Sequence, residues 1–205
     1  MAKIKSNFKN IFLCLFVIST LLSGILGVVN YITKIPIEKT KADKKEMAIK
    51  QVLPSFDKLR EAKVAIETVQ ENNIFKKAQA ADSLTLYDAY TGDKWIGTAI
   101  ETFTDIGFAG RIKLMVGFLP DGNINRIEVL EHTETPGLGD KMEVGKSTFP
   151  EQFFGKNPAD YKLSVTKDGG DVDAITAATI SSKAYCDAVQ TAYNSFIKNG
   201  GKINE

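Results

Sequence analysis

Residues 111–131, RIKLMVGFLPDGNINRIEVLE, decide the fold because they carry the pattern of two β-strands and the turn between them. Residues 111–118 place Ile112, Leu114, Val116 and Phe118 at every second position. This alternation is typical of a strand with one buried face. The turn Pro120-Asp121-Gly122 separates it from residues 124–131, which have the same texture. We therefore predict a β-hairpin here.

A second hairpin precedes the first. Residues 84–90 and 94–103 are short apolar alternations, and they flank the turn residues Thr91-Gly92-Asp93. The four segments together predict a curved antiparallel sheet. Residues 55–80 show no clear periodicity, so only irregular or short elements are expected there.

After the sheet, a glycine-rich loop at residues 132–145 leads to a short helix around 147–154 and a strand candidate at 161–166. A final helix is predicted at about 181–198. Its apolar residues recur at helical spacing: Ala184, Ala188, Val189, Ala192 and Phe196. A sheet with packed helices makes this an α+β domain.

The N-terminal part contains an apolar run. Residues 10–33 carry no charge, and residues 11–32 would span about 33 Å as a helix, close to the thickness of the hydrocarbon core of a bilayer. A single transmembrane helix is predicted; the alternative is a cleaved signal peptide, whose apolar core is normally shorter. After Pro36, residues 38–51 predict a Lys-rich helix that ends at Pro54.

Three regions follow from this pattern: a cytoplasmic tail and transmembrane helix at 1–33, a membrane-proximal helical segment at 34–80, and the main domain at 81–205. Lysines on both sides of the span leave the positive-inside rule undecided. A short tail before a long C-terminal domain resembles an uncleaved signal anchor. We expect a single-pass protein of the cell (inner) membrane with an extracytoplasmic C-terminal domain.

Composition excludes several classes of function. Lys and Arg number 26 against 25 Asp and Glu, so no basic field exists to attract nucleic acid. His132 is the only histidine, and the two cysteines, Cys14 and Cys186, lie far apart in the sequence. This gives no metal-ligand cluster and no disulfide framework. Cys186 and the aromatic residues Trp95, Phe153 and Phe154 are expected in the core.

The segment DVDAITAATISS, residues 171–182, is rich in small and hydroxyl residues and directly precedes the last helix. The first amides of a helix have no partner within the helix, and the helix dipole favours negative charge there. An anion such as a phosphate near Thr179 is one interpretation. Helix capping by the hydroxyl groups is the other.

The segment ETPGLG, residues 134–139, predicts a tight turn. Pro136 stiffens it, Gly137 and Gly139 permit positive φ, and Leu138 offers an apolar contact to a flat ring. The turn could equally serve only to reverse the chain.

Both segments resemble motifs of one known family. Thr176-Ala177-Ala178-Thr179-Ile180-Ser181 is similar to the [ST]-[GA]-A-T-x-[ST] motif of the FMN-binding domain shared by the G subunit of the Rnf electron-transport complex and the C subunit of the sodium-pumping NADH:quinone reductase. Ala177 stands where glycine is common. Residues 134–139 resemble the E-T-P-G-L-G stretch of the same family, preceded in the usual order by residues 110–113 and 121–122. The modest length favours the Rnf protein.

The resemblance implies a site. It implies that a flavin transferase esterifies Thr179 with the phosphate of FMN, so that Thr179 is a tether with no catalytic role. It further implies cofactor contacts from both motifs. By their own chemistry, Glu134 and Thr135 could hydrogen-bond the ring or ribityl chain. Lys141 could approach the ring edge, but a solvated lysine is the favoured interpretation. The implied cofactor-binding residues are Thr176, Ala177, Ala178, Thr179, Ser181, Ser182, Glu134, Thr135, Gly137, Leu138 and Gly139.

The implied function is electron transfer by covalent FMN within an ion-translocating Rnf complex that oxidises ferredoxin, reduces NAD and moves sodium ions or protons across the membrane. The implied partners are the other Rnf subunits and the flavin transferase. The alternatives are a stand-alone extracytoplasmic flavoprotein, the C subunit of the quinone reductase, and a non-redox membrane-anchored binding module.

Overall fold

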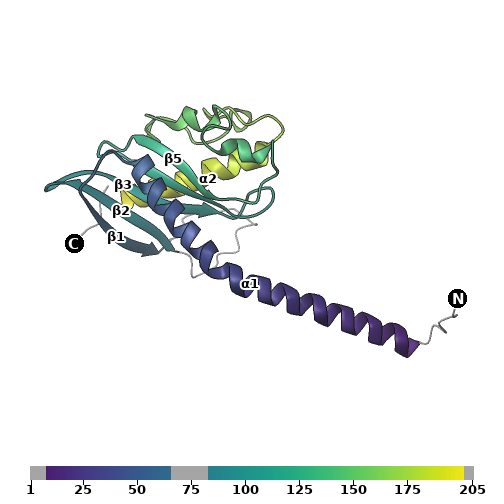
Figure 1. Cartoon of the computed structure of the whole chain (residues 1–205). Coiled ribbons are helices and arrows are strands. Elements are labelled where there is room, and N and C mark those ends of the chain that lie inside the picture. Colours follow the sequence, from purple (N-terminus) through teal and green to yellow (C-terminus); the bar gives the residue numbers. More distant parts are fainter. Residues whose placement is uncertain (1–7, 66–82, 201–205) are drawn as a thin grey trace. The chain divides into compact units, whose positions relative to one another are not determined.

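A computed structural model describes residues 8–65 and 83–200 of the 205-residue chain (Figure 1). The chain divides into two compact units, Met1–Asp43 and Lys44–Glu205. The expectations for the first residues of the tail and for residues 66–80 lie outside the described residues.

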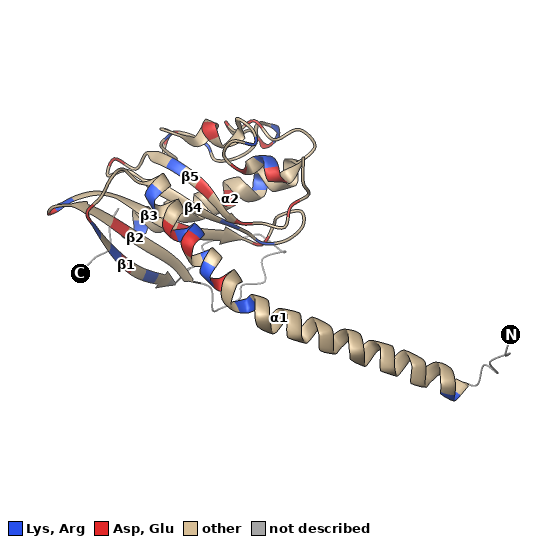
Figure 2. Cartoon of the chain, viewed as in Figure 1, with Lys and Arg blue, Asp and Glu red and all other residues tan. Residues whose placement is uncertain are grey.

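The first unit is formed by the long helix α1, Phe8–Val52, up to Asp43. Its large apolar side chains, such as Leu15, Phe16 and Leu22, are exposed. Figure 2 shows this stretch without charged residues between Lys9 and Lys34. Among the described helices, α1 is the one long and apolar enough to cross a membrane. The length and composition expected of a transmembrane helix are therefore present.

Pro36 lies inside α1, whereas the sequence predicted a separate helix after this residue. Proline removes one backbone donor from a helix. The hydroxyl groups of Thr33 and Thr40 donate to the carbonyl oxygens of Val29 and Pro36 at 2.8 and 2.9 Å, so neighbouring side chains provide hydrogen bonds on either side of it. The helix ends at Val52, shortly before Pro54, as predicted.

The second unit is built on a five-stranded antiparallel sheet in the order β1-β2-β3-β4-β5. The strands are β1 Lys58–Ala65, β2 Ser83–Thr91, β3 Lys94–Thr104, β4 Ile112–Phe118 and β5 Ile124–Glu131. Both predicted hairpins are confirmed. The sequence missed β1, which among the described strands pairs only with β2, at the edge of the sheet. Edge strands tolerate charged side chains, and the sequence KLREAKVA therefore lacks an apolar alternation.

The two faces of the sheet carry separate cores. On one face, Leu114, Val116 and Phe118 pack against helix α2, Thr179–Lys198. On the other face, Met115 and its neighbours pack against the last turns of α1. Figure 1 shows α2 and the end of α1 on opposite sides of the sheet. The period of two in β4 thus fills both cores.

Gly117 allows the end of α1 to approach the sheet. A Cβ atom at Gly117 would lie 2.0 Å from the carbonyl oxygen of Val52, a distance that atoms do not adopt. The side-chain amide of Asn125 also donates to this oxygen at 2.8 Å. The absence of a side chain at Gly117 is therefore required for this packing.

Three short 3-10 helices complete the unit: η1 Gly139–Met142, η2 Phe149–Phe153 and η3 Thr166–Asp168. The short helix expected around residues 147–154 corresponds to η2. The expected final helix is confirmed as α2, which begins at Thr179, and all five of its predicted apolar positions are buried.

The strand predicted at residues 161–166 is wrong. Val165 forms only an isolated bridge with Val172, and neighbouring amides bond within turns, as Tyr161 does to Asn157 at 2.8 Å. Leu163 and Val165 alternate because both are buried in the core, and not because they belong to the sheet. The period of two arose from loop packing.

Candidate functional site

The N-terminus of α2 has no side-chain cap. Ala178 occupies the N-cap position and has no hydroxyl or carboxylate to offer. In the described chain, the backbone amides of Thr179, Ile180 and Ser181 have no hydrogen-bond acceptor, whereas the amide of Ser182 bonds to the carbonyl of Ala178 at 3.0 Å. Three free amides at the positive end of a 20-residue helix suit an anion. The structure thus favours the anion interpretation of this segment over capping.

Ser182 organises the turn before α2 from inside the protein. Its buried hydroxyl accepts from the amide of Ile175 at 2.9 Å and donates to the carbonyl of Ala178 at 3.0 Å. Thr176 and Ala177 are exposed, and Thr179 is half-buried. The hydroxyl of Ser182 therefore supports the turn from inside, whereas Thr176 is exposed and Thr179 is partly exposed.

Ala177 has a φ of 63°, the only positive φ of a non-glycine residue in the described ranges. The left-handed region costs an alanine about 1–2 kcal/mol because its Cβ approaches the following carbonyl oxygen. The conformation explains why glycine suits this position of the motif. It also places backbone strain two residues before Thr179.

Glu134 joins the two sequence motifs. Its carboxylate is buried, and Oε2 accepts a 2.5 Å hydrogen bond from the hydroxyl of Ser181. Oε1 accepts from the backbone amide of Ala109 at 2.9 Å, in the loop between β3 and β4. One side chain therefore connects the loop after β5, the β3–β4 loop and the first turn of α2.

The β3–β4 loop is held by further contacts. The hydroxyl of Thr133 donates to the carbonyl of Ala109 at 2.8 Å, and Arg111 donates to both carboxylate oxygens of Asp105 at 2.6 and 2.9 Å. The Arg111 guanidinium also lies over the ring of Phe103, 4.3 Å from its centroid. This bidentate pair fixes the position at which the loop leaves the sheet.

Gly139 lies in the contact between the motifs. A Cβ atom there would come within 2.8 Å of Glu134 Oε2 and of Ser181 Oγ. Gly137, by contrast, has a φ of 78° and open space around it. The two glycines of the predicted turn therefore serve different purposes: Gly137 permits a left-handed turn and Gly139 permits a close approach.

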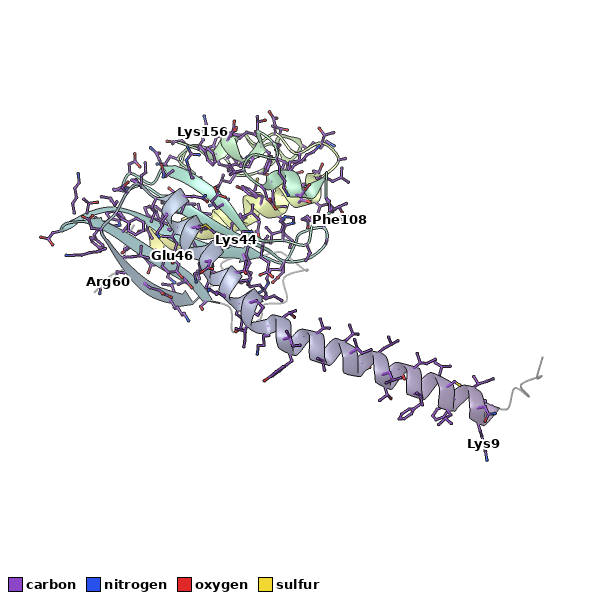
Figure 3. All side chains as sticks on the ribbon, viewed as in Figure 1. Lys9, Lys44, Glu46, Arg60, Phe108 and Lys156 are labelled. Atoms are coloured by element: carbon purple, nitrogen blue, oxygen red, sulfur yellow. The ribbon has the colours of Figure 1, made fainter. Side chains whose placement is uncertain are left out.

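Exposed apolar residues are adjacent in sequence to this junction. Phe108, Leu138 and Ile180 are 68, 40 and 51% exposed. Each is adjacent in sequence to a residue that contacts Glu134, namely Ala109, Gly139 or Ser181. Figure 3 shows Phe108 at the margin of the domain. Exposed apolar groups beside a helix N-terminus are the features that a flat aromatic ring carrying a phosphate requires.

The predicted site residues thus divide by position. Glu134, Gly139 and Ser181 meet in the buried junction, and Ser182 and Ala178 lie at the buried start of α2. Thr135, Pro136, Gly137 and Leu138 are exposed, as are Thr176 and Ala177. Lys141 lies in η1, where its carbonyl accepts from Ser147. The sequence did not predict Phe108, Ala109 or Ile180 as residues of the site. Phe108 and Ala109 are each next to a glycine, and Ile180 lies inside the second motif; the sequence offers no further indication for them.

Residues set aside as structural behave as expected. Cys186 is buried, and this burial raises the pKa of its thiol to about 12. Phe153 is fully buried against Phe149 and Tyr185, and Trp95 and Phe154 pack at the edge of the same core.

In the described ranges, no group of three or more His, Cys, Asp or Glu residues could hold a metal ion.

Comparison with known proteins identifies the domain. Residues 107–194 match the family model described as "FMN-binding domain". The range includes both motifs, the β3–β4 loop from Gly107 and most of α2. The second unit therefore contains an FMN-binding domain, and FMN is its cofactor.

Similar proteins cover almost the whole chain. The G subunit of the ion-translocating oxidoreductase complex from Shewanella piezotolerans is 32% identical over 97% of this chain and 93% of its own length. The protein of the same name from Erwinia tasmaniensis is 35% identical over 86% of this chain and 83% of its own. The chain belongs to the family formed by the G subunits of ion-translocating oxidoreductase complexes. With the apolar helix α1, it is a membrane-anchored member of this family.

Proposed function

We propose that this chain is the electron-transferring G subunit of an Rnf complex and that it carries FMN through a phosphoester to the Thr179 hydroxyl. The observation that carries the proposal is the uncapped N-terminus of α2, where the amides of Thr179, Ile180 and Ser181 have no acceptor in the described chain. A phosphate on Thr179 would accept from these amides and benefit from the helix dipole.

The residues of the two motifs then have different tasks. Glu134, Ser181 and Ser182 hold the framework, because their side chains already bond within the protein. The exposed Leu138, Phe108 and Ile180 provide apolar contacts for the ring, and the exposed Thr135 and Thr176 can bond its polar groups. This assignment modifies the expectation for Glu134, whose two oxygens accept from Ser181 and Ala109.

Attachment requires a flavin transferase. The Thr179 hydroxyl would replace AMP on the phosphate of the FMN half of FAD, so one P–O bond forms, one breaks, and AMP leaves with the displaced oxygen. The exposure of Thr176 and Ala177 leaves this turn open to a second protein. The strained backbone at Ala177 shapes the turn two residues before Thr179.

In electron transfer, bound FMN supplies the ability to accept and donate one or two electrons. The protein supplies position and polarity. The Glu134 carboxylate fixes three segments around the ring, and the apolar side chains exclude water from one of its faces. α1 keeps the domain at a membrane, and we propose the extracytoplasmic side for residues 34–205. Electrons would pass between other proteins of the complex through this domain.

The test is flavin retention after denaturation. The full chain is co-expressed with a flavin transferase, and in-gel fluorescence and intact mass are measured for wild type, Thr179→Ala and Thr176→Ala. Wild type and Thr176→Ala should carry one FMN, and Thr179→Ala none. Equal labelling of Thr179→Ala and wild type would refute the proposed ester. Peptide mapping of the labelled chain then locates the attachment.

Membership in a complex needs a separate test, since a stand-alone flavoprotein would contain the same domain. Purification through a tag on this chain should recover several polytopic membrane proteins in constant ratio. Recovery of the flavoprotein by itself under mild detergent conditions would favour the stand-alone carrier. Protease accessibility from each side of sealed vesicles tests the proposed orientation.

A further inference from the structure

His132 is the sole histidine of the chain, and it lies directly between the sheet and the loop of residues 134–139. Its side chain is 14% exposed. The Nδ1 atom accepts from the backbone amide of Glu134 at 3.1 Å, and Nε2 lies 2.6 Å from Oε1 of Glu143. Both ring nitrogens are therefore engaged, one with the first residue of the motif and the other with the end of η1.

These partners select one tautomer. The amide of Glu134 is a donor, so Nδ1 must carry a lone pair. The proton of the neutral ring then resides on Nε2, from which it is donated to the Glu143 carboxylate. In the doubly protonated ring, Nδ1–H would face the Glu134 N–H, and two donors cannot bond to each other. Protonation of His132 is incompatible with the observed loop contact.

Charged groups of both signs lie around the ring. The carboxylate of Asp140 in η1 and that of Glu143, the residue after η1, both interact with the ring. Glu134 lies two residues after His132 in the chain. Lys146 is the opposing cation: its Nζ lies 3.0 Å from Glu143 and 3.2 Å from Asp140. Glu128 on β5 adds negative charge beyond Glu143. The ring thus lies among these charged groups, while its hydrogen bond to the Glu134 amide leaves no place for a proton on Nδ1.

A continuous chain of contacts leads from this ring to α2. Lys146 bonds to Glu143, Glu143 to His132, His132 to the amide of Glu134, and the carboxylate of Glu134 to Ser181. Ser181 stands two residues after Thr179 in the first turn of the helix. A change at the imidazole can thus reach the proposed attachment site through hydrogen bonds and through the covalent structure of Glu134 and residues 179–181.

We propose that neutral His132, with its proton on Nε2, is a positioning residue for the flavin-binding loop, and that protonation of Nδ1 releases residues 134–139 from this position. The effect on the flavin rests on the function proposed above; the tautomer and the loop contact do not. The flavin environment would then change when the ring takes up a proton on Nδ1.

The first experiment reads the ring and the loop directly. The full chain is labelled with ¹⁵N and studied in detergent micelles, where a single histidine gives one pair of ring-nitrogen signals. At pH 8 we expect Nδ1 to be unprotonated and Nε2 to be protonated. On acidification both nitrogens become protonated. The exchange rate of the Glu134 amide, divided by its intrinsic rate at the same pH, should then rise at least about fivefold, as expected for one lost hydrogen bond.

Two substitutions separate the two bonds of His132. Asparagine can accept from the amide two residues along the chain, as in an Asx-turn, and does not titrate in this range. His132→Asn should keep the loop in the high-pH state from pH 8 to pH 5. His132→Gln reaches Glu143 but lacks the acceptor at the Nδ1 position, so it should show the fast Glu134 exchange at both pH values. The pair differs by one methylene group.

The second experiment follows the flavin. In the flavinylated chain, the visible absorption and circular dichroism spectra should change with pH in wild type, following the titration of the ring. They should stay constant in His132→Asn, and in His132→Gln they should resemble the acidic wild-type spectrum throughout. A wild-type Nδ1–H tautomer at pH 8, or a His132→Asn protein that titrates like wild type, would overturn the proposal.

The two proposals fail in different ways. A chain without flavin on Thr179, but with the expected tautomer and Glu134 exchange, would refute the ester and leave the positioning role intact. A chain with covalent flavin whose Glu134 amide exchanges equally in His132→Asn and His132→Gln would refute the positioning role alone.

Discussion

The hydroxyl of Ser181 donates a 2.5 Å hydrogen bond to Oε2 of Glu134, across 47 residues of sequence. The contact joins the turn after β5 to the first turn of α2, and the backbone amide of Ala109 completes it from a third segment. All three segments carry an exposed apolar side chain beside the contact. The proposed flavin-binding surface is therefore organised around one buried carboxylate.

Replacement of this carboxylate should destabilise the domain. Glu134→Ala leaves the Ser181 hydroxyl and the Ala109 amide without an acceptor, which should lower the free energy of unfolding by about 2–4 kcal/mol. Urea unfolding followed by the fluorescence of Trp95, the only tryptophan, measures the change. The control is Glu151→Ala, which removes an exposed carboxylate and should shift stability by less than about 0.5 kcal/mol. Equal effects of the two would contradict the framework role of Glu134.

A methyl group at Gly139 should separate the two motifs. In Gly139→Ala the new Cβ would lie 2.8 Å from both Glu134 and Ser181, so the turn has to move away from α2. We expect a loss of about 1–3 kcal/mol together with a lower yield of flavinylated chain. Gly137→Asn is the matched control, because asparagine tolerates its left-handed backbone and the space around it is open. If both variants flavinylate normally, the close approach is not needed for the site.

Relief of strain at Ala177 should stabilise the protein. Ala177→Gly removes the Cβ that makes a φ of 63° unfavourable, and the free energy of unfolding should rise by up to about 1 kcal/mol, net of the greater freedom of glycine in the unfolded chain. Ala174→Gly, at a position without positive φ, should lower it by about 0.5–1 kcal/mol. Denaturation midpoints of the two variants should therefore move in opposite directions. A decrease in both would show that position 177 is unstrained in solution.

The hydroxyl of Tyr185 should be dispensable. It is completely buried and has no hydrogen-bond partner among the described residues, and burial raises its pKa well above the usual value. Tyr185→Phe removes an unsatisfied polar group and keeps the ring contacts with Phe149 and Phe153. We expect a gain of about 1 kcal/mol in thermal or urea unfolding. Tyr193→Phe, which loses a 3.3 Å bond to Asn157, should bring a small loss instead.

Glu143 should contribute to the loss of folding stability at acidic pH. Burial acts to raise its pKa, but hydrogen bonds from His132 and Lys146 prevail and hold the pKa below the usual value. A carboxylate with a lowered folded pKa stabilises the folded state above its unfolded pKa of about 4.5, and this contribution is lost as the pH falls through the folded value. Between about pH 5 and 3, wild type should therefore lose more stability than Glu143→Gln. Parallel curves for the two proteins in this range would contradict the assignment.

Local pattern was sufficient for much of the fold. The alternation in β4 and the helical spacing of Ala184 to Phe196 mark the side chains that pack between the sheet and α2. Turn residues separate the strands, so the hairpins and α2 could be predicted. β1 could not, because an edge strand paired on one side keeps a charged sequence. The false strand at residues 161–166 shows the converse: Leu163 and Val165 are buried in a loop, and burial alone reproduces a period of two.

The sequence by itself determined the apolar span, the two hairpins, the final helix and the two motifs that resemble an FMN-binding domain. Only the tertiary structure decided how the motif residues divide. Glu134 and Ser181 face each other inside the protein, and Leu138 and Thr176 are exposed. From outside both motifs, Ala109 and His132 make hydrogen bonds with Glu134. Sequence spacing cannot determine this, because hydrogen bonds between residues 109, 134 and 181 depend on how the sheet brings distant loops together.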